Sequence, residues 1–184
     1  ENKKALAVIH GSGIHVNERQ FPEIYDMLKT YAFRLGLKAI PECYIVESNI
    51  QNASDTKYGS KSVIMLTEDM IHSCVATGNV QALGFIIGHE MAHAALGHHG
   101  YIRSNISRNW KKLSRLDEQS CDRVAKALVG DREAALNGMI VLAIGSHLMK
   151  FINKDELLGQ VNAVMNNKYT LKSEKKLTHP LLLR

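Results

Sequence analysis

Two histidines and a glutamate lie within five consecutive residues of this 184-residue chain, in the pattern H-E-x-x-H formed by His89, Glu90 and His93. Four residues make about one helical turn, so a helix would place both imidazoles on one face, with their Cβ atoms about 5–6 Å apart. Two nitrogens at that separation can bind one zinc ion at about 2.0–2.1 Å. Glu90 would project about 100° round the helix, where its carboxylate can accept a proton from a water molecule that the metal activates. The pattern therefore predicts a hydrolytic metal centre. Two histidines satisfied by hydrogen bonds are the alternative, and that alternative leaves the glutamate unexplained.

A catalytic zinc site needs a third protein ligand, and the sequence offers two candidates. His99 follows the first histidine of the motif by ten residues, which is the metzincin spacing, but Leu96 stands where that pattern requires glycine. Glu118 follows the second histidine by 25 residues and precedes Asp122 by one helical turn. One carboxylate of such a pair can bind the metal while the other hydrogen-bonds to the far nitrogen of a ligand histidine and fixes its tautomer.

The elements that must position these side chains follow from apolar periodicity, caps and glycines. We expect strands over 43–47 and 62–66, and helices over 22–35, 67–75, 80–96, 115–129, 131–151 and 155–166. Asp131 and Asp155 are the expected N-caps of the last two helices. The polar stretch 48–61 predicts a loop or hairpin, and 1–16, which shows no clear period, predicts a flexible N-terminal segment. Residues 167–184 are expected to form a C-terminal tail, which is basic at first. The expected fold class is α+β: a mostly helical domain with a small sheet placed early and the H-E-x-x-H motif inside a helix.

Composition excludes several other classes of protein. With 45% apolar and 22% charged residues, 13 Gly and 3 Pro, the chain is typical of one globular domain over 1–184 and not of a disordered or collagen-like protein. The longest apolar stretch, 138–149, has 12 residues, against about 20 for a membrane span. The net charge of +5 is spread over isolated lysine pairs, so we expect no nucleic-acid partner. The chain begins at Glu1, which is compatible with a signal peptide or membrane anchor upstream.

The three cysteines are not arranged for a disulfide framework. Cys43, Cys74 and Cys121 are an odd number without C-x-x-C spacing. The same absence argues against a zinc cage of thiolates. We expect all three to be small buried side chains.

Four stretches between roughly residue 40 and the C-terminus match, in order, the motifs of one peptidase family. They are Asn52-Ala53, His89-Glu90-x-x-His93 with a further histidine at His98, Glu118-x-x-x-Asp122, and Thr178-His179-Pro180 with Arg184. On these residues the chain resembles the gluzincin metallopeptidases of the HtpX and CAAX-prenyl-protease-like family, in the compact form called minigluzincins. The resemblance implies a zincin-like domain that hydrolyses peptide bonds.

The resemblance also implies a role for each residue of the metal centre. One zinc ion would be bound by His89, His93 and Glu118, with Asp122 supporting a ligand histidine. Glu90 would be the general base. Peptides or proteins would be the substrates.

The remaining family motifs concern the reacting carbonyl and the substrate backbone. His179 and Arg184 resemble the pair that stabilises that carbonyl, although Arg184 follows His179 by five residues and the family usually has six. From the residues alone, His179 is equally well explained as a loop histidine before a turn-favouring proline. Asn52 and Ala53 resemble the segment near the substrate-binding edge strand, and we expect the strand over 62–66 to pair with an extended substrate.

An alternative function is a non-catalytic or latent metal-binding interaction domain of the same fold. Glu90 argues against the non-catalytic form, because a structural metal site has no use for a base beside an open position. Latency would follow if the apolar end formed by 181–183 lay in or beside the cleft. The resemblance favours the cell envelope or a membrane-associated location over the cytoplasm.

Overall fold

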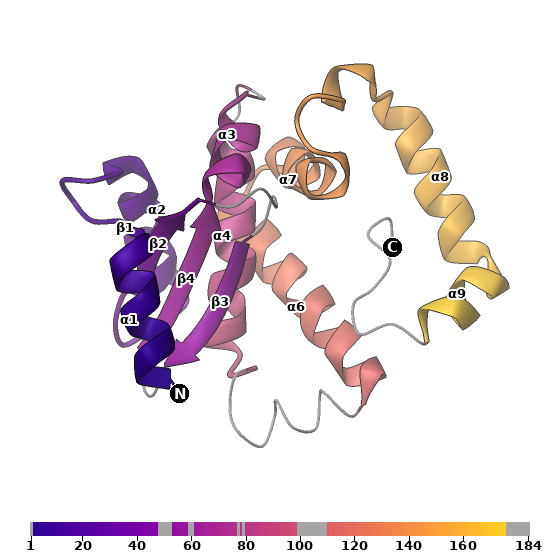
Figure 1. Ribbon diagram of the computed structural model, residues 1–184. Coiled ribbons are helices and arrows are strands. Elements are labelled where there is room, and N and C mark those ends of the chain that lie inside the picture. The colour runs from indigo at the N-terminus through magenta and orange to yellow at the C-terminus, as the bar shows by residue number, and fades with distance from the viewer. Residues whose placement is uncertain are drawn as a thin grey trace.

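The computed structural model describes residues 2–47, 53–58, 61–76, 78, 80–98 and 110–175 (Figure 1). Its elements are α1 (Asn2–Ser12), β1 (Ile14–His15), α2 (Pro22–Arg34), β2 (Glu42–Val46), β3 (Ala53–Tyr58), β4 (Lys61–Thr67), α3 (Glu68–Ala76), α4 (Val80–Ala95), α6 (Lys111–Val129), α7 (Arg132–Ile144), the 3-10 turn η1 (Met149–Phe151), α8 (Lys154–Asn166) and α9 (Lys168–Glu174). The named strands all precede α3. The fold is therefore α+β and mostly helical with a small early sheet, as the sequence predicts.

The four strands form one sheet in the order β1-β2-β4-β3, in which β2 and β4 run parallel and the other neighbours antiparallel. Alternate residues of β2 and β4 point to opposite faces. Tyr44 and Val63 pack on one face with Ile9 of α1, which Figure 1 shows lying across the sheet. The opposite face joins the main core with four buried side chains: Cys43, Ile45, Ile64 and Leu66. The sheet is thus covered by α1 on one face and by the larger helical layer on the other.

The strand expected to pair with substrate is not at the edge. β4 contains the predicted 62–66 run and lies between β2 and β3. Val63, Ile64 and Leu66 are fully buried, and a strand buried on both faces is typical of a sheet interior. The edge strand is β3, whose sequence Ala-Ser-Asp-Thr-Lys-Tyr is polar, as edge strands commonly are. The prediction that 62–66 is an edge strand free to pair with substrate was therefore wrong.

The N-terminal segment also differs from the expectation of a flexible stretch over 1–16. Residues 2–12 form α1, and β1 pairs with β2. Ile9 is 8% exposed in the small core that it shares with Tyr44 and Val63. Contacts with distant strands thus order this segment, although its own sequence shows no clear period.

The C-terminal helices depart from the predicted boundaries. α7 ends at Ile144 rather than near Phe151, because Gly145 adopts a positive φ of 72°. The N-cap of α8 is Asn153, whose side chain accepts hydrogen bonds from the next helical amides, and not Asp155. The expected tail, 167–184, begins with a further helix, α9.

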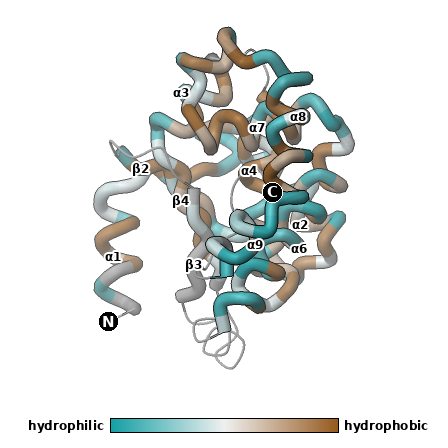
Figure 2. The backbone as a smooth tube through the Cα atoms, turned by 90° about the vertical axis from the view of Figure 1, so that its right-hand side faces the viewer, coloured by the Kyte–Doolittle hydropathy of each residue, from teal (hydrophilic) through white to brown (hydrophobic). Residues whose placement is uncertain are grey.

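α4 is the central helix and packs most extensively against α6, then α7. Nine of its residues are buried: Ala82, Leu83, Gly84, Phe85, Ile86, Ile87, Gly88, Met91 and Ala92. In Figure 2 α7 is mostly apolar, whereas α9 is mostly hydrophilic. Arg34 of α2 donates hydrogen bonds to the carbonyls of Ala127 and Leu128, which ties down the C-terminal end of α6. The two helices that carry the motifs are therefore fixed by the core.

Within the described ranges, no helix combines the length and apolarity that crossing a bilayer requires.

Candidate metal centre

Two histidine nitrogens of α4 lie close to the carboxylate of one glutamate of α6. The Nε2 atoms of His89 and His93 are 3.3 Å apart. Glu118 approaches them with Oε2 at 3.3 Å from the first and Oε1 at 3.7 Å from the second. Ligands bound tetrahedrally to zinc at about 2.0–2.1 Å lie about 3.3 Å from one another. The donor set and its spacing therefore fit one zinc ion.

A glycine allows the two helices to approach closely at this point. A Cβ atom on Gly88 would lie 3.2 Å from Cα of Ala125 and 3.3 Å from Cδ1 of Leu128. Gly88 immediately precedes His89, and Ala125 lies two helical turns after Glu118. The absence of a side chain at 88 therefore keeps the separation between the histidines and the glutamate short.

Asp122 holds the imidazole of His89 by a direct hydrogen bond. The Nδ1–H of His89 donates to Oδ1 of Asp122 at 2.8 Å, which leaves Nε2 as the nitrogen that faces His93 and Glu118. Burial lowers the pKa of His89, but hydrogen bonds to Asp122 and Glu118 and the charge of Glu90 outweigh it and raise the pKa to about 10. The surrounding carboxylates thus strongly favour positive charge at this point.

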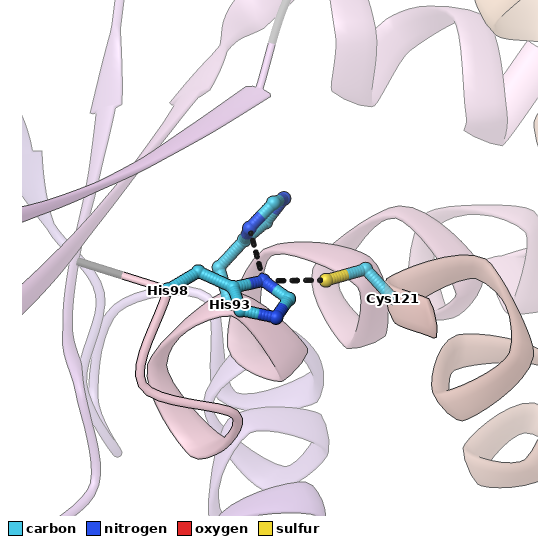
Figure 3. Close-up of side chains that lie close together, drawn as sticks. All are labelled: His93, His98 and Cys121. Carbon is cyan, nitrogen blue, oxygen red and sulfur yellow. Dashed lines mark hydrogen bonds between the residues drawn. The ribbon is translucent and has the colours of Figure 1, made fainter. Parts of the chain in front are cut away.

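His93 has a different neighbour on its far side (Figure 3). Its Nδ1 lies 3.1 Å from Nδ1 of His98, which in turn is 3.5 Å from Sγ of Cys121. On the other side of the ring, Nε2 of His98 lies 3.5 Å from Oδ1 of Asp117. The side chains of His98 and Asp117 are only 8% and 7% exposed. Burial, and then the nearby carboxylates, raise the pKa of the Cys121 thiol, so the thiol is protonated at neutral pH.

The family of the chain is established by a match over residues 46–162, which is more than half of the chain and includes all of α4 and α6. This stretch matches the family described as Peptidase U49. The chain belongs to the Peptidase U49 family. As a Peptidase U49 member, it is a peptidase, a hydrolase whose substrates are proteins or peptides. Comparison with curated proteins and with solved structures finds no match.

Most of the predicted site of this Peptidase U49 chain lies in one place. Four of the predicted residues meet at the α4–α6 interface: His89, His93, Glu118 and Asp122. Glu90 follows His89 on α4, and its charge raises the pKa of that histidine. Ala53 begins the edge strand β3 and pairs with Leu66. The other candidates, Asn52, His99, His179, Arg184 and the apolar end at 181–183, lie outside the described residues.

The sequence did not predict that Asp117 and Cys121 contact His98 beside the candidate metal centre. A signal for both was present, because they precede Glu118 and Asp122 by one residue each and so share the neighbouring stripe of the same helix. Cys121 was expected only as a buried side chain, and all three cysteines are buried and free.

Proposed function

We propose that this Peptidase U49 chain is a zinc-dependent metalloendopeptidase of the gluzincin type. His89, His93 and Glu118 would hold one zinc ion. The observation that carries the proposal is the convergence of two imidazole nitrogens and the two oxygens of one carboxylate, from two separate helices, at separations of 3.3–3.7 Å. Two imidazoles and one carboxylate are a ligand set of catalytic zinc sites, which keep one position open.

Glu90 is the proposed general base. A bound zinc ion would supply a Lewis acid that polarises the substrate carbonyl and activates water. Glu90 accepts the proton of the attacking water and then donates it to the leaving amine. In support of this role, Glu90 follows His89 directly on α4, and its charge raises the pKa of that histidine. Asp122 keeps the Nε2 atom of His89 directed at the common point.

Substrate binding is proposed at the outer strand of the sheet, β3. An extended peptide can add to β3 through main-chain hydrogen bonds, because β3 pairs on only one side within the described sheet. The family resemblance of Asn52 and Ala53 agrees with this choice, since Ala53 begins β3. His179, and Arg184 with it, remain the proposed groups that stabilise the reacting carbonyl.

The replacement Glu90→Gln tests the function. We expect this variant to bind one zinc ion and to cleave casein about 10²–10⁴-fold more slowly than the wild type, because the base is lost while the ligands stay. Glu23→Gln, an exposed change on α2, is the matched control and should leave both quantities unchanged. A chelator should abolish wild-type cleavage, and added zinc should restore it.

Two results would contradict the proposal. One is full activity of Glu90→Gln, and the other is wild-type cleavage that a chelator does not affect. A wild type that binds zinc without cleaving any peptide would instead favour the latent or non-catalytic alternative.

A further inference from the structure

The two histidines of α4 are supported on their far sides in different ways. His89 donates directly to Asp122, whose side chain is 36% exposed. His93 instead contacts a second imidazole, and a buried carboxylate lies behind that ring. The motif and the proposed mechanism give no role to either His98 or Asp117.

We propose that His98 is a positioning residue for His93, and that Asp117 fixes the orientation of the His98 ring. The proposal rests on the proposed zinc site, because it concerns how one of the zinc ligands is held. In it, the Nδ1–H of His93 donates to Nδ1 of His98, and the Nε2–H of His98 faces the carboxylate of Asp117. The Nε2 atom of His93 is then left as the metal-binding nitrogen, as it is in His89.

The turn that ends α4 brings His98 back against the helix. The amide of His98 donates to the carbonyl of His93 at 3.0 Å, and the amide of Gly97 donates to the carbonyl of Ala94 at 3.3 Å. Gly97 has a φ of 71°. These two bonds form a Schellman motif, which requires a left-handed residue at this position. The turn therefore returns the ring of His98 to His93, one helical turn back.

The buried position of Asp117 indicates the direction of the hydrogen bonds. Asp117 is the one charged residue among the buried positions that the structure describes. A buried carboxylate is costly unless a donor faces it, and it can only accept hydrogen bonds when ionised. Oδ1 of Asp117 lies 3.5 Å from Nε2 of His98, so the proton of this imidazole is favoured on Nε2. Nδ1 of His98 is then the acceptor that His93 needs.

A second metal ion is the competing explanation of the same cluster. Ligand atoms of His93, His98 and Cys121 all lie within 4.8 Å of one another. Such an ion would require His93 to bind two metals through its two nitrogens, and it would require Cys121 as a thiolate. Without a metal ion, burial and then the nearby carboxylates raise the pKa of the Cys121 thiol, so metal binding would have to displace its proton. The hydrogen-bonded arrangement needs neither change.

The experiment compares His98→Leu with His98→Gln. Zinc affinity is measured by competition with a chromophoric chelator, and folding is measured by thermal unfolding. We expect His98→Leu to bind zinc about 10–100-fold more weakly than the wild type, as is usual when the outer partner of a ligand histidine is lost. His98→Gln, which offers an amide oxygen to His93, should recover part of that loss. His72→Leu, an exposed change on α3, should bind as the wild type does.

A purely structural role would give the opposite order, because leucine packs in a buried site better than glutamine. Wild-type affinity in His98→Leu, or weaker binding in His98→Gln than in His98→Leu, would overturn the proposal. If His98→Leu does not fold, His98→Gln is compared with the wild type alone. We then expect zinc to bind to His98→Gln several-fold more weakly than to the wild type, and equal or tighter binding would overturn the proposal.

Metal content and cobalt spectra separate the remaining outcomes. One metal ion per wild-type chain, with no sulfur-to-cobalt charge-transfer band, supports the positioning role. Two ions per chain, falling to one in Cys121→Ala, would overturn it in favour of the second metal. A wild type that binds no metal would instead defeat the proposed function, whatever the His98 variants do.

Discussion

The α4–α6 pair and the α8–α9 pair are both helical, but different forces hold them. Nine residues of α4 are buried, and Gly88 lets α6 approach it closely. None of the described residues of α8 is buried, and Figure 1 shows this helix standing apart from the sheet. α8 and α9 begin instead with local caps, in which Asn153 and Asn167 accept hydrogen bonds from the first helical amides.

This difference explains where a metal centre can be built. Donor atoms must be held at fixed separations, and close-packed helices give that rigidity. The carboxylates of α6 are directed at α4 by the core around them. Asp155 and Glu156 of α8 lie in its first turn, where their negative charges interact favourably with the helix dipole. No described residue of α8 is buried, so no packed interface holds these carboxylates in place.

The largest expected effect comes from removing the charge of a carboxylate on α6, compared with the same change on α8. Glu118→Gln should weaken zinc binding by more than about 100-fold, because it removes a charged ligand. Losing a residue that only hydrogen-bonds to a ligand weakens binding by at most about 100-fold. Cleavage of casein should be lost with the metal. Glu156→Gln on α8 is the matched control and should change neither. Metal analysis after dialysis checks both variants, and zinc retained in full by Glu118→Gln would remove the carboxylate from the site.

A glycine-to-leucine change sharpens the comparison of packing. Gly88→Leu should destabilise the fold by about 1–3 kcal/mol, because the new side chain meets Ala125 and Leu128 across the α4–α6 interface. Gly159→Leu on α8 has nothing within 4 Å of its Cβ position, so higher helix propensity should stabilise it by up to about 1 kcal/mol. Urea denaturation measures both. Equal effects at the two positions would contradict the contrast between the regions.

The smallest expected effect concerns the caps of the exposed helices. Asn153→Ala should destabilise α8 by about 0.5–2 kcal/mol, because two amides lose their acceptor. Zinc content should not change. Asn162→Ala, an exposed position inside the same helix, should be neutral or slightly stabilising. Hydrogen exchange of the α8 amides reports both changes, and reduced zinc binding in Asn153→Ala would show that the two regions are coupled.

Much of the site could be predicted from the sequence because its signals are local. The spacing of His89 and His93 is a helical turn, and so is that of Glu118 and Asp122. Gly97 and Gly130 mark the ends of the two helices, and both have positive φ. These features depend on the geometry of one helix at a time.

The remainder depends on contacts between distant segments. The order of strands placed β4 inside the sheet, although its apolar run gave no sign of its neighbours. α1 is held by Tyr44 and Val63, which its own sequence could not reveal. The role proposed for Asp117 likewise requires knowing that the turn after α4 brings His98 to it.

X-ray absorption at the zinc edge of the wild-type protein tests the central claim most directly. That claim is that α4 and α6 present two imidazoles and one carboxylate to a single metal ion. We expect a first shell of nitrogen and oxygen only, at about 2.0–2.1 Å, with the outer scattering of two imidazoles. A sulfur ligand at about 2.3 Å would place the metal at Cys121 and contradict the account.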